Sequence, residues 1–228
     1  MKWILLKSNN PADALALATV ISKNDCYFGI VRRSNITQFF TGLEKVSISF
    51  YVPDDESELV TIEEIETDSW KKKCDIIASQ LLLGSISDYS PYSGFEKHIE
   101  EIEKYFVSTN NCLLYLLPIP DQNLDLILID QLVRLMEQQG VRSVSGGSFF
   151  YPCIKGTLDL RQTISFSVLC GIMPLISFVI TTDRAIASIC EAYNKKGFVI
   201  SQGESMTIDG QILQDANQVL NYINLAIE

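Results

Sequence analysis

The 228-residue chain contains a single histidine, His98, and this scarcity limits the catalytic sites that it can build. A metal site with several histidine ligands is excluded. A Ser-His-Asp or Cys-His arrangement would have to use His98, which falls beside the apolar stripe of an expected helix. We expect this histidine to pack against its helix and to hydrogen-bond locally, so it does not by itself indicate catalysis.

Glycine-rich cofactor signatures are also missing. The chain has neither G-x-G-x-x-G nor a Walker lysine at the required spacing. Gly146 and Gly147 follow the expected strand "VRSVS", and the backbone amides of such a turn can hold an anion. Because the next segment, "FFYPC", does not begin a helix, a tight structural turn is the simpler interpretation.

Basic residues are few. Lysine and arginine number 18 against 28 acidic residues, so the formal net charge is −10. Binding to a phosphate backbone needs clustered basic side chains, and we therefore expect no nucleic-acid partner. The largest basic cluster, Lys71–Lys73, follows an acid-rich stretch and predicts a solvated patch, with binding of an anionic ligand as the alternative.

The six cysteines form no C-x-x-C pair. Four lie in apolar runs and are expected to be buried small hydrophobic residues, namely Cys26, Cys112, Cys170 and Cys190. The N-terminal segment "MKWILLKSNNP" has an apolar run of only four residues, too short for a signal-peptide core. Together these features predict a reducing, cytoplasmic location.

Apolar strands alternate with helical patterns along most of the chain. Three stretches, beginning near Lys2, Cys112 and Leu175, share the order strand, polar turn, helix and strand. We predict an α/β fold with a mainly parallel or mixed sheet flanked by helices, built from about three βαβ units. The prediction is a single domain over residues 1–228, with a subdivision near residues 108–111 as the alternative.

An acid-rich excursion near residues 53–68 interrupts this pattern. Its apolar residues are too sparse for a core element, so we expect it to be exposed, with an edge strand around Leu59 to Ile62. A docking surface for a basic partner is the alternative interpretation.

Residues 162–182 carry no charged side chain and are long enough to cross a bilayer, which takes ~20 apolar residues. However, Ile164, Phe166 and Val168 alternate with serines, which is typical of a strand. We therefore expect no membrane span but two strands on either side of a turn. In the second strand, Phe178 and Val179 are expected to be among the most buried residues.

Polar residues that follow the expected strands form the candidate site, because ligands of open α/β sheets bind beyond the carboxyl ends of strands. The candidate ligand-binding residues are Asn9, Asp88, Tyr92, Ser145, Gly146, Gly147 and Ser148. Asp121 and Asp183 are the catalytic candidates, because paired carboxylates can hold Mg²⁺ or act as acid and base. The alternative is that such residues only cap helices.

The missing motifs and the acid-rich excursion favour a non-catalytic interaction or assembly subunit of a cytoplasmic complex, with a protein partner or self-association. The alternative hypothesis is a small-molecule-binding enzyme, in one form metal-assisted, with its site at the carboxyl ends of the strands. The sequence assigns no metal ligands and identifies no cofactor.

Overall fold

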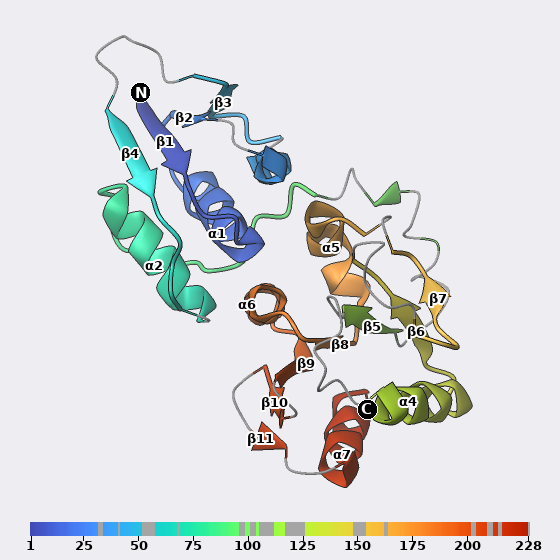
Figure 1. Ribbon diagram of the computed structural model, residues 1–228. Coiled ribbons are helices and arrows are strands. Elements are labelled where there is room, and N and C mark those ends of the chain that lie inside the picture. The colour runs from blue at the N-terminus through green and yellow to red at the C-terminus, as the bar shows by residue number, and fades with distance from the viewer. Residues whose placement is uncertain are drawn as a thin grey trace. The chain divides into compact units, whose positions relative to one another are not determined.

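The chain forms two compact units, Met1–Phe95 and Glu96–Glu228, in a computed structural model (Figure 1). We call them the N-terminal unit and the C-terminal unit and describe each by itself. The structure describes residues 1–31, 34–40, 42–51, 58–67, 69–95, 99–100, 104, 112–116, 126–147, 154–161, 164–201, 204–208, 212–213 and 216–227.

The N-terminal unit contains a four-stranded sheet in the order β3-β2-β1-β4, and every pair of neighbouring strands is parallel. Its strands are β1 (Lys2–Leu6), β2 (Phe28–Val31), β3 (Val46–Ser49) and β4 (Leu59–Ile62). Its helices are α1 (Pro11–Ser22), α2 (Trp70–Gln80) and the 3₁₀ helix Ser34–Phe40.

Helix α1 begins where the sequence signals a start. The Asn10 side chain accepts a hydrogen bond from the Ala12 amide at 2.9 Å, and Pro11 takes the first helical position. Every residue from Pro11 to Ile21 is buried, because small and branched apolar side chains surround the whole helix. On the sheet, Gly29 is the register partner of Trp3 and leaves room for its indole ring.

The C-terminal unit contains a seven-stranded sheet in the order β11-β10-β9-β8-β5-β6-β7. Its strands are β5 (Cys112–Leu116), β6 (Arg142–Ser145), β7 (Leu158–Asp159), β8 (Phe178–Thr181), β9 (Lys196–Ser201), β10 (Glu204–Thr207) and β11 (Ile212–Leu213). Its helices are α4 (Leu126–Gln138), α5 (Phe166–Ile172), the 3₁₀ helix Met173–Leu175, α6 (Arg184–Ala192) and α7 (Ala216–Ile227). The pairs β9–β10 and β10–β11 are antiparallel, and the other neighbouring strands of this sheet are parallel.

Helices cover both faces of this second sheet. Phe178 and Ile180 of β8 join a core cluster with apolar residues of α4 and α7, while α5 and α6 lie on the other side of the strands (Figure 1). Phe178 and Val179 point to opposite faces, and both are fully buried. The prediction that these two residues lie at the centre of a sheet is confirmed.

The predicted fold class is confirmed: each sheet is mostly parallel and is accompanied by helices. The three predicted βαβ units are β1–α1–β2, β5–α4–β6 and β8–α6–β9, and the two strands of each unit belong to one sheet with parallel direction. The single domain with a subdivision near 108–111 stays a prediction, and the two units meet in the sequence between Phe95 and Glu96.

The first half of the uncharged stretch differs from the prediction. Phe166–Ile172 is the helix α5 and not a strand. The Ser165 hydroxyl accepts a hydrogen bond from the Val168 amide, so this serine caps a helix rather than lining the polar face of a strand. Within the described ranges, no helix has the length and apolar character that crossing a bilayer requires.

Two further expectations about exposure can be compared with the structure. The edge strand around Leu59 to Ile62 is confirmed, since β4 ends the order of its sheet. Cys170 and Cys190 are buried, and their burial raises the pKa of both thiols well above the ordinary value. Cys26 is exposed, contrary to the prediction, because it lies in the turn before β2.

Candidate functional site

A buried ion pair lies at the carboxyl edge of the N-terminal sheet. Lys73 Nζ of α2 is 2.6 Å from Asp13 Oδ1 in the first turn of α1. The other carboxylate oxygen, Oδ2, accepts hydrogen bonds from the Ser8 hydroxyl at 2.6 Å and from the Ile65 amide at 3.2 Å. Asp13 is 0% exposed and Lys73 is 1% exposed, so water screens neither charge.

This network joins two loops that follow neighbouring strands. Ser8 comes after β1, and Ile65 comes after β4, which pairs with β1 in parallel. Lys73 also donates to the Ile65 carbonyl oxygen at 2.9 Å, so the ammonium holds both partners at once. Since buried charges are tolerated only when paired and hydrogen-bonded, the network stabilises one arrangement of these loops. Asn9, a predicted ligand-binding residue, is exposed beside it.

The prediction of a solvated Lys71–Lys73 patch is wrong for Lys73, although Lys71 and Lys72 are exposed. The signal that identifies Lys73 is its helical position. It is three residues after Trp70 and four before Ile77, two buried residues that face the core. A lysine inside an apolar stripe needs a buried anion, and Asp13 supplies it.

A second polar edge is formed by the carboxyl ends of β6 and β8 in the C-terminal unit. Both strands pair with β5, where Ser145 and Ile180 are opposite the same residue, Tyr115. Strands are spaced by about 4.8 Å, so these two strand ends lie roughly 10 Å apart. The structure therefore brings Ser145, Gly146 and Gly147 to the same edge as Asp183.

Asp183 caps helix α6, as the capping interpretation expected. Its Oδ1 accepts a hydrogen bond from the Ala185 amide at 2.8 Å, and its own amide donates to Thr181 Oγ1 at 3.0 Å. The residue is half-buried, and its cap uses only one of the two carboxylate oxygens. Asp183 thus retains acceptor capacity at this edge.

The two glycines present backbone rather than side-chain groups at the same edge. Gly147 has φ +96°, a left-handed conformation that glycine adopts without strain. The Ser145 hydroxyl is 1% exposed, lies 2.6 Å from Thr157 Oγ1 and accepts from the Ile154 amide at 3.2 Å. Ser145 therefore supports the turn, in which Gly146 is buried and Gly147 is half-buried.

Asp88 and Tyr92 lie elsewhere. No strand or helix occurs in residues 81–95, and Asp88 Oδ2 pairs with Lys23 Nζ at the carboxyl end of α1. Asn9 lies near the opposite end of this 12-residue helix, roughly 18 Å away at 1.5 Å per residue. The Tyr92 amide donates to Thr19 Oγ1, and its ring packs edge-on against Phe95. Both residues therefore hold the 81–95 segment against α1.

Asp121, Ser148 and His98 lie outside the described residues. The paired carboxylates expected from Asp121 and Asp183 stay a prediction, as does the partner or self-association. Among the residues that the structure describes, no group of three or more His, Cys, Asp or Glu side chains could hold a metal ion.

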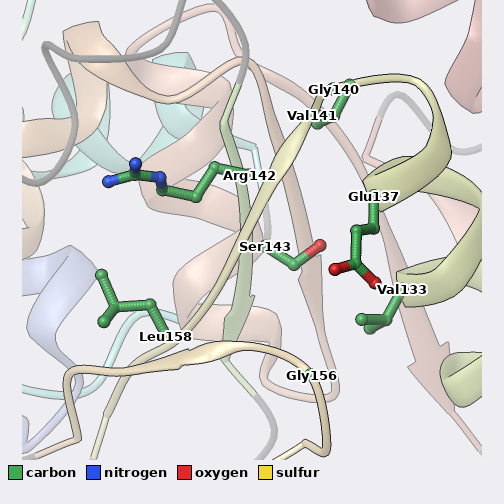
Figure 2. A pocket seen from close by; sticks show the side chains of 8 residues that line it. All are labelled: Val133, Glu137, Gly140, Val141, Arg142, Ser143, Gly156 and Leu158. Atoms are coloured by element: carbon green, nitrogen blue, oxygen red, sulfur yellow. The ribbon is translucent and has the colours of Figure 1, made fainter.

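A pocket of about 490 Å³ opens at the amino end of β6, away from the strand-end edge (Figure 2). Its lining residues come from the end of α4, the start of β6 and the turn before β7: Val133, Glu137, Gly140, Val141, Arg142, Ser143, Gly156 and Leu158. Strand β7 pairs with β6 only at Val144 and Ser145. The beginning of β6 is therefore not covered by β7.

Comparison with solved structures gives matches over the whole chain, although no protein-family model and no curated protein matches the sequence. The E. coli heptosyltransferase WaaC with ADP has a TM-score of 0.62 at 10% identity, covering 99% of this chain and 97% of that chain. E. coli ADP-heptose LPS heptosyltransferase II has a TM-score of 0.58 at 7% identity, covering 100% and 98%. A family 9 glycosyl transferase from Veillonella parvula has a TM-score of 0.57 at 8% identity, covering 86% and 80%.

At these identities the likeness shows the fold alone, an α/β fold that the chain shares with solved heptosyltransferases and with a family 9 glycosyl transferase. It contradicts the predicted non-catalytic assembly subunit, because the structures that share the fold over nearly the whole chain are enzymes. The missing motifs misled the prediction, since active sites built from separate loops leave no local signature. The alternative hypothesis, a small-molecule-binding enzyme, fits the comparisons better.

Proposed function

We propose that this chain is a glycosyltransferase that binds a nucleotide-linked sugar and transfers the sugar to an acceptor hydroxyl. The observation that carries the proposal is the likeness to heptosyltransferases, one of them solved with ADP, over almost the full length of both chains. The carboxyl edges of the parallel sheets support it, because ligands of open α/β sheets bind there.

We assign nucleotide binding to the carboxyl edge of the C-terminal sheet. Backbone amides of the Gly146–Gly147 turn suit a diphosphate, because amides that point into a turn favour anions. The oxygen of Asp183 that its cap does not use suits a ribose or sugar hydroxyl, because a carboxylate only accepts hydrogen bonds. The distance of roughly 10 Å between the two strand ends is sufficient for a diphosphate and the ring attached to it.

In the N-terminal unit, we assign the proton acceptor of the reaction to Asp13. The transfer breaks the bond between the sugar carbon and the nucleotide phosphate and forms a bond to the acceptor oxygen, whose proton must go to a base. The Asp13 carboxylate accepts three hydrogen bonds in this structure, and a carboxylate has about four acceptor sites. Because Asp13 is fully buried, this role requires the Ser8–Asn10 loop to open when the acceptor binds.

Thermal unfolding with ADP, UDP and GDP tests nucleotide binding. A ligand at 100 times its Kd stabilises a protein by about 2.7 kcal/mol, so we expect a clear rise in Tm with at least one nucleotide, and with ADP first. Asp183→Asn keeps an oxygen for the helix cap but removes the charge. It should leave the ligand-free Tm unchanged and weaken nucleotide binding about tenfold. No rise in Tm with any of the three nucleotides would contradict the proposal.

The proposed role of Asp13 as proton acceptor can be distinguished from its structural role in variants that lack its partner, Lys73. Lys73→Met alone leaves the carboxylate in place, and Lys73→Met with Asp13→Asn removes both charges. We expect the double variant to be the better folded of the two, and to release nucleotide from a nucleotide sugar far more slowly than Lys73→Met does. Equal rates in the two variants would limit Asp13 to a structural role.

A further inference from the structure

The pocket at the amino end of β6 contains a buried hydroxyl without a partner. Ser143 is 7% exposed, and its Oγ makes no hydrogen bond within the described part of the chain. In Figure 2 this oxygen points away from the strand toward the helix that carries Glu137. A buried hydroxyl without a partner lowers stability, and a ligand that pairs with it removes this cost.

Glu137 supplies an unpaired charge on the same side of the pocket. It is exposed, belongs to the last turn of α4, and forms no ion pair with any residue that the structure describes. The carboxyl end of a helix carries a partial negative charge, which adds to that of the carboxylate. The side of the pocket between α4 and β6 therefore presents hydrogen-bond acceptors and negative charge.

Arg142 does not neutralise this side. It precedes Ser143 in the strand, so its side chain leaves the opposite face, as Figure 2 shows. The remaining walls are small or apolar. Gly140 has φ +74° and open space around it, Gly156 adds no side chain, and Val133 adds an apolar side chain from α4. Leu158 pairs with Val144, so its side chain lies on the same face as that of Arg142 (Figure 2).

We propose that this pocket binds a small organic cation with a primary ammonium group. The ammonium donates to the Glu137 carboxylate and, after rotation about one side-chain torsion, to the Ser143 hydroxyl, while the carbon skeleton occupies the space beside Gly140 and Gly156. The protein's net charge of −10 raises the local concentration of such cations. The site is separate from the carboxyl edge to which we assign nucleotide binding.

Titration with glucosamine, followed by calorimetry, tests the proposal, and glucose serves as the uncharged control of the same ring size. We expect saturable binding of glucosamine with a Kd of about 1 mM, as expected for a ligand of a dozen heavy atoms, and at least tenfold weaker binding of glucose. Glu137→Gln should weaken glucosamine binding at least tenfold, and Ser143→Ala should weaken it severalfold.

Glu64→Gln, which removes an exposed glutamate from the N-terminal unit, is the matched control and should bind as the parent chain does. Glu137 is exposed, so its replacement should leave the fold intact, and an unchanged Tm checks this. Three results would each overturn the proposal: no saturable glucosamine binding, equal binding of glucose, or full binding by Glu137→Gln. Nucleotide-induced stabilisation in Glu137→Gln is independent of this site and should be retained.

Discussion

Lys73 Nζ lies 2.6 Å from Asp13 Oδ1, although 60 residues separate the two in the sequence. Both side chains are buried, and each has further hydrogen bonds to the loops that follow β1 and β4. The pair thus connects α1, α2 and two strand ends at the edge where an open α/β sheet binds its ligands. Its contribution to stability can be measured directly.

Lys73→Met should destabilise the chain by about 3–5 kcal/mol, because it leaves the Asp13 carboxylate buried without its counter-ion. Urea unfolding measured by circular dichroism gives the free energy of unfolding. Lys72→Met, one position earlier on the exposed side of α2, is the control and should change it by less than about 0.5 kcal/mol. Equal losses in the two variants would show that the ion pair does not stabilise the fold.

Gly29→Ala should destabilise the N-terminal unit by about 1–3 kcal/mol through overpacking. A methyl group at Gly29 would overlap the Trp3 ring, which is 5% exposed and cannot move into solvent without losing its packing. The fluorescence of Trp3 reports the displacement, with Trp70→Phe as background to remove the other tryptophan. Gly84→Ala is the control, because a methyl group there meets nothing within 4 Å. A Gly29→Ala variant as stable as Gly84→Ala would contradict this account.

Asp183→Ala should cost about 1 kcal/mol of stability, since it removes the acceptor for the Ala185 amide at the start of α6. Asp183→Ser keeps a side-chain oxygen for the cap and should recover most of that loss. Chemical unfolding of the three chains measures both differences. If serine and alanine were equally destabilising, the cap would not be the source of the effect.

The Asp88 carboxyl should titrate below its ordinary pKa of 3.8, because the hydrogen bond and charge of Lys23 favour its ionised form, with Ser90 contributing further hydrogen bonds. A lowered folded-state pKa means that the stabilisation is present above the unfolded pKa and is lost as the pH falls below about 4. The NMR shift of the carboxyl carbon measures the titration. Lys23→Met should return the pKa toward 3.8, and an unchanged pKa in that variant would contradict the assigned cause.

The difference in stability between the parent chain and Asp88→Asn should follow the same dependence on pH. It should be constant near neutrality and should shrink as the pH falls below about 4, where the Asp88 carboxyl of the unfolded chain becomes protonated while that of the folded chain is still ionised. Because this carboxyl is exposed, the difference should also be small and should decrease with added salt.

Local periodicity was sufficient for most of the secondary structure and for the fold class. Helix α1 has its Asn10 cap and Pro11, and β8 is an apolar run buried on both faces, so each element is specified by residues within its own segment. The same reasoning was wrong at Phe166–Ile172, where serines two residues apart suit a strand face but Ser165 instead caps a helix. When the pattern of a short segment fits both a strand and a capped helix, its packing against the rest of the chain determines which of the two forms.

The position of the candidate site could be determined only from the tertiary structure, because its residues become neighbours only when the strands are ordered in the sheet. Ser145 and Asp183 follow different strands, and they share an edge only because β6 and β8 flank β5. Asp88 also carries a carboxylate in a polar loop, yet it lies at the other end of α1, because no strand precedes it.

Lys73 shows the difference most directly. Its helical spacing places it among buried residues, but spacing cannot identify the anion that makes burial tolerable. That anion is Asp13, 60 residues earlier, and the pairing exists because β1 and β4 are neighbours in the sheet. Short-range propensity acts within a few residues, whereas electrostatic pairing and strand order act between segments that meet only after folding.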